Sequence, residues 1–336
     1  MALKTMALVN TRRAVLAVLA VGCVCCGGKP GVMADAGAEA AGPVCGEPLP
    51  PDAESLSSDL GARIYAINQF FMGDTDTSGT PDANAWQRIG FDLDHTDTSN
   101  PQQQPNCSTQ DTAFLLDGNC GIDNGLGSYF DSFPTISPLS QLQTSQATSG
   151  QWTLLLSVSG AAAGSSSTQL GGALYVGSPL TSPPRFDGSD VWPPMTDSAP
   201  GGQYANAWSD AYLVGASLFV TGRMLVPFDF SVGSGTRKRV VLQVELIEMD
   251  LSSDGASVTH GILAGIIPPA SQSSFFGTCA GPATYYTDIL SDGSVDPTRP
   301  CDATSFGIGF TAQAVTLGQP AAGLPAPPPC GGGAGG

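Results

Sequence analysis

The sequence is poor in charged residues and in histidine. Charged side chains make up 12% of the 336 residues, and there are two histidines. Soluble domains usually carry about twice that share of charge. Only 12 residues are basic against 29 acidic ones, which gives a net charge of −17 at pH 7. Because binding to nucleic acid needs a basic face, the composition excludes nucleic acid as a partner.

Recognisable catalytic and cofactor motifs are also absent. The chain has no Gly-x-Ser-x-Gly elbow, no His-Glu-x-x-His pair, no phosphate-binding glycine-rich loop and no dinucleotide fingerprint. No Cys-x-x-Cys pair stands beyond the N-terminal signal region, so zinc lacks its usual ligand spacing. His95 and His260 are isolated and are interpreted as structural. These absences make an enzyme the less favoured interpretation.

No apolar run long enough to span a membrane follows the N-terminal region. Lys4, Arg12 and Arg13 precede an uncharged apolar run over residues 14–21, which has the length of a signal-peptide core. The next residues, Gly22-Cys23, resemble a lipobox, which predicts a signal peptide over residues 1–22 and lipidation of Cys23. Cleavage by an ordinary signal peptidase at 32–34 or 34–36 is the alternative.

We therefore expect an exported protein. An outer-membrane or cell-surface lipoprotein is favoured over a periplasmic or secreted protein, with membrane contact only through the lipid anchor. Residues 23–58 are rich in Gly, Ala, Pro and acid, which predicts a disordered tether. Residues 319–336 form a low-complexity tail, and residues 59–318 between them are predicted to form a single β-rich domain.

Helix signals are few, and alternation of apolar and polar residues is frequent. Alternating segments at 152–158, 212–220, 240–251, 257–267 and 306–310 predict half-buried strands, and the best helix candidate covers 137–147. The alternation changes phase after Ile247, which predicts a β-bulge near Leu246 and Ile247. Asp254-Gly255 predicts a hairpin turn. Together these signals predict a mainly β fold, an antiparallel β-sandwich or jelly roll with long loops and one or two short helices.

The nine cysteines fit an oxidising compartment. Six of them lie beyond the signal region. Their spacing favours two local disulfides, Cys107–Cys120 and Cys279–Cys301, and leaves Cys45 to pair with Cys330. Six cysteines allow 15 pairings, so the spacing expresses a preference among alternatives.

Aspartate-rich loops are the main candidate for a metal site. Five of the 29 acids are glutamates, so aspartate dominates, often beside Gly, Asn, Ser or Thr. Two loops are predicted to meet and to hold one calcium ion, through Asp92, Asp94, Asp97, Asp117, Asn119 and Asp123. Calcium takes six to eight oxygen ligands, which these residues with carbonyls and water can supply. The alternative is that Asp, Asn and Gly merely build tight turns.

Two weaker groups of candidates remain. Glu245 and Glu248 stand in a Glu-Leu-Ile-Glu-Met-Asp run that resembles the strand acids of sandwich-fold glucanases, and they are the candidate catalytic pair of a hydrolase. The tryptophans Trp86, Trp192 and Trp208 are candidate ligand-stacking residues, because aromatic faces beside Asp and Asn suit sugars. Packing in the core is the alternative for all three.

Three motifs resemble those of a known group of proteins. They are Trp-x-x-x-Gly-Phe-Asp-Leu-Asp at 86–94, Asp-Gly-Asn-Cys-Gly-Ile-Asp-Asn-Gly-Leu-Gly at 117–127, and Cys-Asp-Ala-Thr-Ser-Phe-Gly-Ile-Gly-Phe at 301–310. They are similar to motifs in a functionally uncharacterised group of exported proteins and lipoproteins of gliding soil bacteria. The resemblance covers most of residues 64–318. It implies export and one continuous domain, and it carries over no catalytic residue.

The expected function is a surface-tethered binding or scaffold protein. Its expected ligand is a polysaccharide or another envelope component, and a structural calcium ion is its expected cofactor. A glycan-cleaving hydrolase of a sandwich fold and a purely structural envelope protein are the alternatives.

Overall fold

The computed structural model describes residues 61–99, 105–108, 117–131, 139–159, 170–232, 236–275 and 287–323. Strands dominate these ranges: β1 Arg63–Phe71, β2 Thr153–Val158, β3 Leu170–Gly177, β4 Val191–Trp192, β5 Asn206–Val214, β6 Ser217–Val232, β7 Thr236–Leu251, β8 Ser257–Ile267 and β9 Thr304–Leu317. The α-helices are short: α1 Gly125–Asp131, α2 Leu139–Thr148 and α3 Pro269–Phe275. Two 3₁₀ turns complete them, η1 Ala85–Arg88 and η3 Asn119–Gly121.

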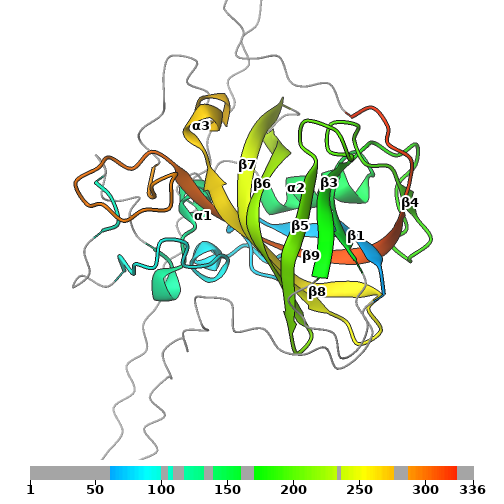
Figure 1. The fold of residues 1–336 in the computed structure, drawn as a ribbon, viewed down its shortest axis with the longest axis horizontal. Helices are drawn as coiled ribbons and strands as arrows, with labels where there is room; N and C mark the ends of the chain where they lie inside the picture. The colour runs from blue at the N-terminus through cyan, green and yellow to red at the C-terminus, as the bar shows by residue number, and fades with distance from the viewer. Residues whose placement is uncertain are drawn as a thin grey trace, which may run out of the picture. The chain divides into compact units, whose positions relative to one another are not determined.

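Eight of the strands form one closed sheet (Figure 1). β1, β2, β3 and β5 to β9 each pair antiparallel with the next of these strands in the chain. β9 then pairs antiparallel with β1, from Ile64↔Val315 to Phe71↔Gly309, and this pairing closes the sheet. The fold is an eight-stranded up-and-down β-barrel. The predicted β-sandwich or jelly roll is therefore wrong.

The error has a physical cause. Alternation of period two reports that one face of a strand is buried, and this holds equally for a barrel strand and a sandwich strand. What distinguishes the two architectures is the pairing of the first strand with the last. The partners in that pairing are separated by more than 230 residues of sequence, as in Phe71↔Gly309. Local pattern carries no information on it.

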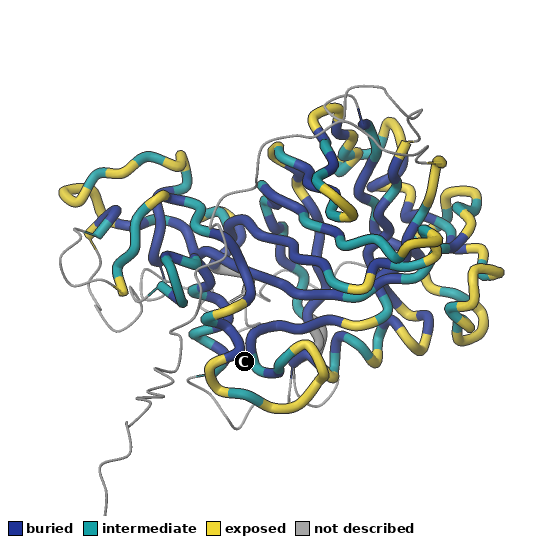
Figure 2. The backbone as a smooth tube through the Cα atoms, turned by 90° about the horizontal axis from the view of Figure 1, so that it is seen from below, coloured by how far each residue is buried: buried dark blue, intermediate teal, exposed yellow. Residues whose placement is uncertain are grey.

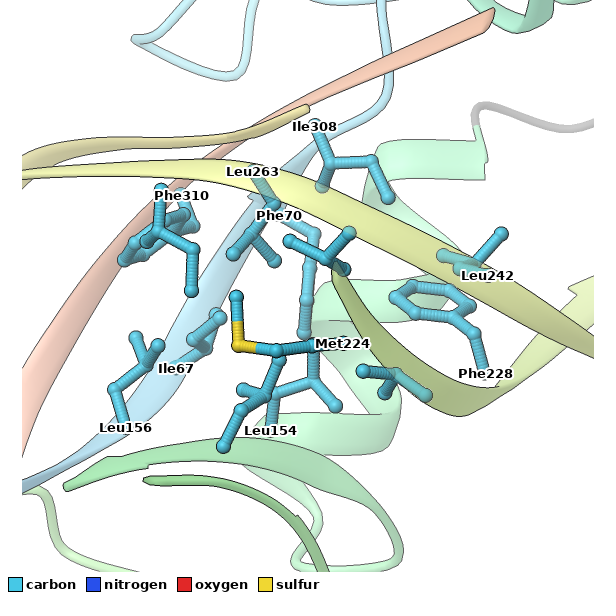
Figure 3. Packing of buried hydrophobic residues seen from close by; sticks show 14 of the residues in the cluster. Ile67, Phe70, Leu154, Leu156, Met224, Phe228, Leu242, Leu263, Ile308 and Phe310 are labelled. Carbon is cyan, nitrogen blue, oxygen red and sulfur yellow. The ribbon is translucent and has the colours of Figure 1, made fainter. Parts of the chain in front are cut away.

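Large apolar side chains fill the interior of the barrel (Figure 3). An eight-stranded barrel is narrow enough for side chains to fill it. Every strand of the ring contributes, and the largest fully buried side chains include Trp152, Tyr65, Phe70, Phe228, Phe230, Phe306 and Phe310. Figure 2 shows the same division along the chain, with buried strands and exposed connecting loops. The barrel core is therefore a packed apolar interior built from inward-facing residues.

Helix α2 supplies partners for the end of β1. The backbone N–H of Phe70 donates to Thr144 Oγ1 at 3.0 Å, and that of Met72 donates to Ser140 Oγ at 2.8 Å. Ser140 and Thr144 are four residues apart and so lie on one face of the helix. The helix predicted at 137–147 is confirmed as α2.

The long β6–β7 hairpin carries the predicted bulge. On β7, Val240, Leu242 and Val244 belong to the barrel core, and so do Ile247 and Met249. The register with β8 shifts between Val244 and Leu246, where one extra residue changes the phase. The bulge predicted from the sequence is confirmed at this place. The strand predicted over 212–220 is instead divided, because the chain turns between Val214 and Ser217 with Gly215 at φ 59°.

Two segments pack on the outer face of the barrel. Trp192 is fully buried against a cluster formed by Ala66, Leu155 and Val315 of β1, β2 and β9. Phe91 packs in a second cluster, which contains Leu246, Ile262 and Ala264 of β7 and β8. This second cluster anchors the Asp92–Asp97 loop against β7 and β8. The neighbouring strand is β9, which pairs with β8 and whose Ser305 binds the carboxylate of Asp288.

The disulfide connectivity differs from the predicted one. Cys107 pairs with Cys301, 194 residues away, and both side chains are buried beside Leu290. Cys120 is also disulfide-bonded. The local pairs Cys107–Cys120 and Cys279–Cys301 are therefore wrong. Spacing favours short loops because they close at low entropic cost, yet the folded barrel already brings distant segments together. Cys23, Cys45, Cys279 and Cys330 lie outside the described residues, as do the predicted signal peptide and tether.

Candidate metal centre

The two predicted aspartate loops lie against each other. Phe91 and Asp123 form an antiparallel bridge, and the Asp123 N–H donates to the Phe91 carbonyl at 2.9 Å. Asp123 Oδ2 accepts hydrogen bonds from the backbone N–H groups of Leu93, at 2.6 Å, and Asp94, at 3.3 Å. Further along, the Thr98 N–H donates to Asp117 Oδ2 at 2.6 Å. The prediction that the two loops meet in space is therefore confirmed.

Three carboxylates form the centre of this contact. One oxygen from each of Asp92, Asp94 and Asp123 lies within 4.8 Å of the other two. Asp94 is 3% exposed and Asp123 is 1% exposed, so two of the three charges are removed from water. Asp94 Oδ1 accepts from the N–H and hydroxyl of Thr96, at 2.8 and 2.7 Å, and Asn106 Nδ2 donates to its Oδ2.

A third segment of the chain adds a carboxylate that sequence reasoning missed. Asp288 is buried, and it accepts hydrogen bonds from the N–H of Ser305, at 2.8 Å, and from the Ser305 hydroxyl. Ser305 belongs to β9, so the barrel wall holds this carboxylate in place. Asp288 is separated from Asp123 by more than 160 residues, and no local pattern connects the two. Asn106, which contacts Asp94 from 12 residues further along the chain, was also missed.

The aspartates of this centre raise one another's pKa values. Burial raises the pKa of Asp92 to about 6, and the charge of Asp94 adds to the effect. Burial, together with the charges of Asp94 and Asp288, raises the pKa of Asp117 to about 7. The pKa of Asp123 is raised well above its ordinary value, by burial first and then by the charges of Asp94, Asp117 and Asp288. Burial raises the pKa of Asp94, and it raises that of Asp288 to about 7.

Among the described residues, no lysine or arginine forms an ion pair with these carboxylates, and His95 lowers the pKa values of Asp92 and Asp94 less than burial raises them. The carboxylates are those of Asp92, Asp94, Asp117, Asp123 and Asp288, the five aspartates that we call the acidic cluster. Asp92 Oδ1 is buried and has no hydrogen-bond partner. A buried carboxylate oxygen without a partner is costly unless a cation is beside it. The donor set is all oxygen, which suits a hard cation such as Ca²⁺.

Two glycines allow the close approach of the loops. Gly121 has φ 83°, and a Cβ added there would lie 2.8 Å from the Thr96 carbonyl and 3.3 Å from the Asp92 carboxylate. A Cβ on Gly125 would overlap the carboxylate of Asp288. A larger residue at Gly121 would clash with the Thr96 carbonyl and crowd Asp92, and one at Gly125 would displace the Asp288 carboxylate. The glycines of the 117–127 motif therefore shape a cradle of oxygen atoms.

Two of the predicted ligands, Asp97 and Asn119, lie outside the group of three carboxylates. Asp97 Oδ1 accepts a hydrogen bond from the Ser99 hydroxyl, and Asn119 begins η3. The structure thus brings Asp92, Asp94, Asp117 and Asp123 together from the predicted set and adds Asp288.

The predicted catalytic and aromatic residues are placed differently. Glu245 accepts a hydrogen bond from Gln243 Nε2 at 2.7 Å, and its Oε1 lies 3.8 Å from Arg223. A surface groove of about 520 Å³ runs beside β1, β2 and β9, and Arg63 is its one charged lining residue, so it holds neither Glu245 nor Glu248.

The three tryptophans proposed for ligand stacking, Trp86, Trp192 and Trp208, are at most 8% exposed. Their role is packing.

Glu248 permits a test that is independent of the metal centre. Burial, with a smaller effect from Asp250, raises its pKa to about 7. A raised folded-state pKa stabilises the fold at low pH and loses that contribution as pH rises through about 7. Glu248→Gln should therefore raise the free energy of unfolding at pH 8 by roughly 1–2 kcal/mol, after allowing for partial exposure, and leave it unchanged at pH 5. Urea unfolding at both pH values measures this. Equal effects at pH 5 and pH 8 would contradict it.

No family model, curated protein or solved structure matches this chain. In the part of the chain that the structure describes, none of the helices is long and apolar enough to cross a membrane.

Proposed function

We propose that this protein is an exported, lipid-tethered scaffold in which a β-barrel carries a calcium-stabilised loop module. The observation that supports this most directly is the acidic cluster, with its close carboxylates from Asp92, Asp94 and Asp123. Asp92 Oδ1, buried without a partner, is the oxygen that most requires a cation. The cation joins segments from three parts of the chain and so fixes the outer loops on the barrel wall.

Calcium fits this site better than magnesium or a transition metal. Calcium accepts irregular geometry and several carboxylates, whereas magnesium prefers octahedral geometry and retains water. The described residues place no histidine or cysteine in the group of three, so soft or imidazole-preferring metals find no suitable ligand. Extracellular calcium modules have dissociation constants of about 10⁻⁴ to 10⁻³ M, and we expect an affinity in this range.

The carried ligand is proposed to be an envelope component. The acidic surface and the predicted tether support a protein that works outside the cell. The burial of Trp86, Trp192 and Trp208 removes the stacking surface that supported a carbohydrate ligand. A scaffold role therefore explains the packed barrel and the rigid loops more directly than sugar binding does.

Calcium binding is testable on the purified full chain. Calorimetry should show saturable binding, and calcium at 100 times its dissociation constant should raise the free energy of unfolding by about 2.7 kcal/mol relative to chelator. Asp123→Asn keeps the shape of the side chain but removes its charge, so this variant should lose the calcium response. Asp76→Asn is the matched control, since that carboxylate accepts hydrogen bonds only within its own turn, from Ser78 and Thr80.

The outcomes separate the site from a set of acidic turns. A wild-type protein that shows no binding heat and no shift in unfolding at 10 mM calcium would overturn the proposal. Equal calcium responses in wild type and Asp123→Asn would place the binding elsewhere and would also overturn it.

A further inference from the structure

A short segment, residues 105–108, connects the acidic cluster to the disulfide. The Ser108 N–H donates to the Arg299 carbonyl and the Cys301 N–H donates to the Ser108 carbonyl, both at 2.8 Å. The Asp296 N–H donates to the Asn106 carbonyl at 2.7 Å. These bonds lay the segment along residues 296–301, and the Cys107–Cys301 disulfide locks it there.

The same segment presents one side chain to the cluster. Asn106 is 1% exposed, and its Nδ2 donates to Asp94 Oδ2. The neighbouring Thr96 occupies the other oxygen, Oδ1, of Asp94. Asn106 therefore sets the direction in which this carboxylate points, and the adjacent Cys107 sets the place of Asn106.

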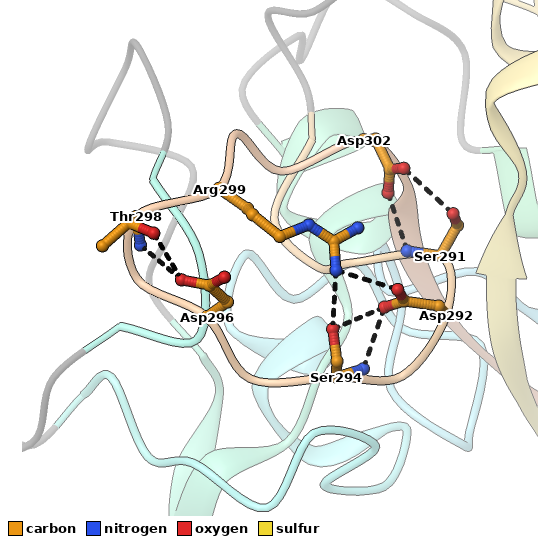
Figure 4. A network of polar contacts seen from close by, with 7 residues as sticks. All are labelled: Ser291, Asp292, Ser294, Asp296, Thr298, Arg299 and Asp302. Carbon is orange, nitrogen blue, oxygen red and sulfur yellow. Dashed lines mark hydrogen bonds and ion pairs between the residues drawn. The ribbon is translucent and has the colours of Figure 1, made fainter.

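Residues 288–302, which include the stretch bonded to this segment and are called the strip below, are tied together by a network of polar contacts (Figure 4). Asp302 accepts from the N–H and hydroxyl of Ser291, at 2.7 and 3.0 Å. Arg299 donates to Asp292 Oδ2 at 2.8 Å and to Ser294 Oγ at 3.0 Å. The strip leads from Asp288 of the acidic cluster to Cys301. The disulfide thus joins two segments that both end in groups of the cluster.

We propose that the Cys107–Cys301 disulfide is a clasp that makes cation binding depend on oxidation, with Asn106 as the positioning residue for Asp94. This inference rests on the proposed calcium site and names its regulation. Only the oxidised chain holds Asn106 on Asp94, so the site assembles after export into an oxidising compartment. The protein therefore binds cations tightly only in that compartment.

The chemistry of the clasp is a thiol–disulfide exchange. The two cysteine thiols lose two electrons and two protons as the S–S bond forms. A disulfide donor of the oxidising compartment takes them up and becomes two thiols. In the reduced chain no covalent bond retains the segment, and its backbone hydrogen bonds to residues 296–301 act without the disulfide. Its ordering then has to be supplied by the cation, which lowers the apparent affinity.

The test compares Tb³⁺, a luminescent substitute for Ca²⁺, in four full-length proteins. They are wild type, Cys107→Ser/Cys301→Ser, Asn106→Ala, and all three substitutions combined. We expect the double serine variant to bind Tb³⁺ at least tenfold more weakly than wild type. Asn106→Ala, which keeps the disulfide, should also bind about tenfold more weakly. The combined variant should bind no more weakly than the double serine variant, because both changes remove the same constraint.

Asp187→Asn is the control for a removed charge, since this exposed carboxylate accepts hydrogen bonds from Ser189 in a separate loop and should leave Tb³⁺ affinity unchanged. Losses that multiply in the combined variant would show that Asn106 and the disulfide act independently and would overturn the clasp. Unchanged affinity in the double serine variant would overturn it as well. If that variant does not fold, unchanged affinity in Asn106→Ala is the overturning result. Absence of binding in wild type would instead refute the calcium site itself.

Discussion

In the presence of a chelator, the free energy of unfolding should fall by roughly 4 kcal/mol as the pH rises from 5 to 8. The acidic cluster is the cause. Asp288 and Asp117 have pKa values raised to about 7, and Asp92 has one raised to about 6. In the unfolded chain an aspartate titrates near 3.9. The folded protein therefore binds protons more tightly than the unfolded one over this pH range.

The direction follows from this difference. A raised folded-state pKa contributes stability that is complete below the unfolded pKa and is lost as pH rises through the folded pKa. For Asp288 the window extends from about 4 to about 7, and one pKa unit corresponds to about 1.4 kcal/mol. Exposed aspartates such as Asp76 and Asp292, whose pKa values are lowered by hydrogen bonds from serines, are ionised throughout pH 5–8. They do not contribute to the slope.

Calcium should remove most of this loss. Bound cation neutralises the same carboxylates, so the curves with 10 mM calcium and with chelator should meet near pH 5 and separate towards pH 8. Urea unfolding at four pH values measures both curves. Asp288→Asn should be more stable than wild type at pH 8 in chelator and similar at pH 5. A chelator curve that rises between pH 5 and pH 8 would refute the assignment of these carboxylates as the destabilising groups.

Several of the strands could be predicted from the sequence, but β1 and β3 were missed and the closure of the strands into a ring could not be predicted. The β8 strand was predicted at 257–267 and lies at Ser257–Ile267. The bulge in β7 was readable because an inserted residue changes the phase of alternation locally. Closure depends on β9 meeting β1, and the choice between barrel and sandwich lies in that single long-range pairing.

The acidic cluster shows the same limit. Asp92 and Asp94 stand two residues apart, and Asp117 and Asp123 share a glycine-rich loop, so each half was recognisable. Asp288 and Asn106 come from other segments, and the disulfide that places Asn106 joins residues 194 apart. At the tryptophans, a neighbouring Gly or Pro suggests a loop, while burial depends on which segment covers the side chain. Trp192 is covered because its own strand β4 pairs with the end of β9.

Phe228→Ala should lower the free energy of unfolding by about 3–5 kcal/mol, both with calcium and with chelator. Phe228 is fully buried in the barrel core, with ring centroids 4.6 Å from Trp152, 4.5 Å from Phe230 and 6.0 Å from Phe70. Its removal leaves a cavity among aromatic rings that cannot collapse without breaking their contacts. Leu225→Ala on the same strand is the matched control; Leu225 is 44% exposed, so its loss should stay within about 0.5 kcal/mol.

The comparison between conditions decides how the barrel relates to its metal module. Among the described residues, the hydrogen bonds of the acidic cluster go to Leu93, Thr98, Ser305 and other loop groups and not to the aromatic partners of Phe228, so the two losses should add within about 0.5 kcal/mol. Phe228→Ala/Asp123→Asn should then lack the calcium response while keeping the full cost of the cavity. A core loss that depends on calcium by more than about 1 kcal/mol would mean that the cation organises the barrel interior itself. In that case the barrel would not be an independent scaffold, because its core would form only together with the loops it carries.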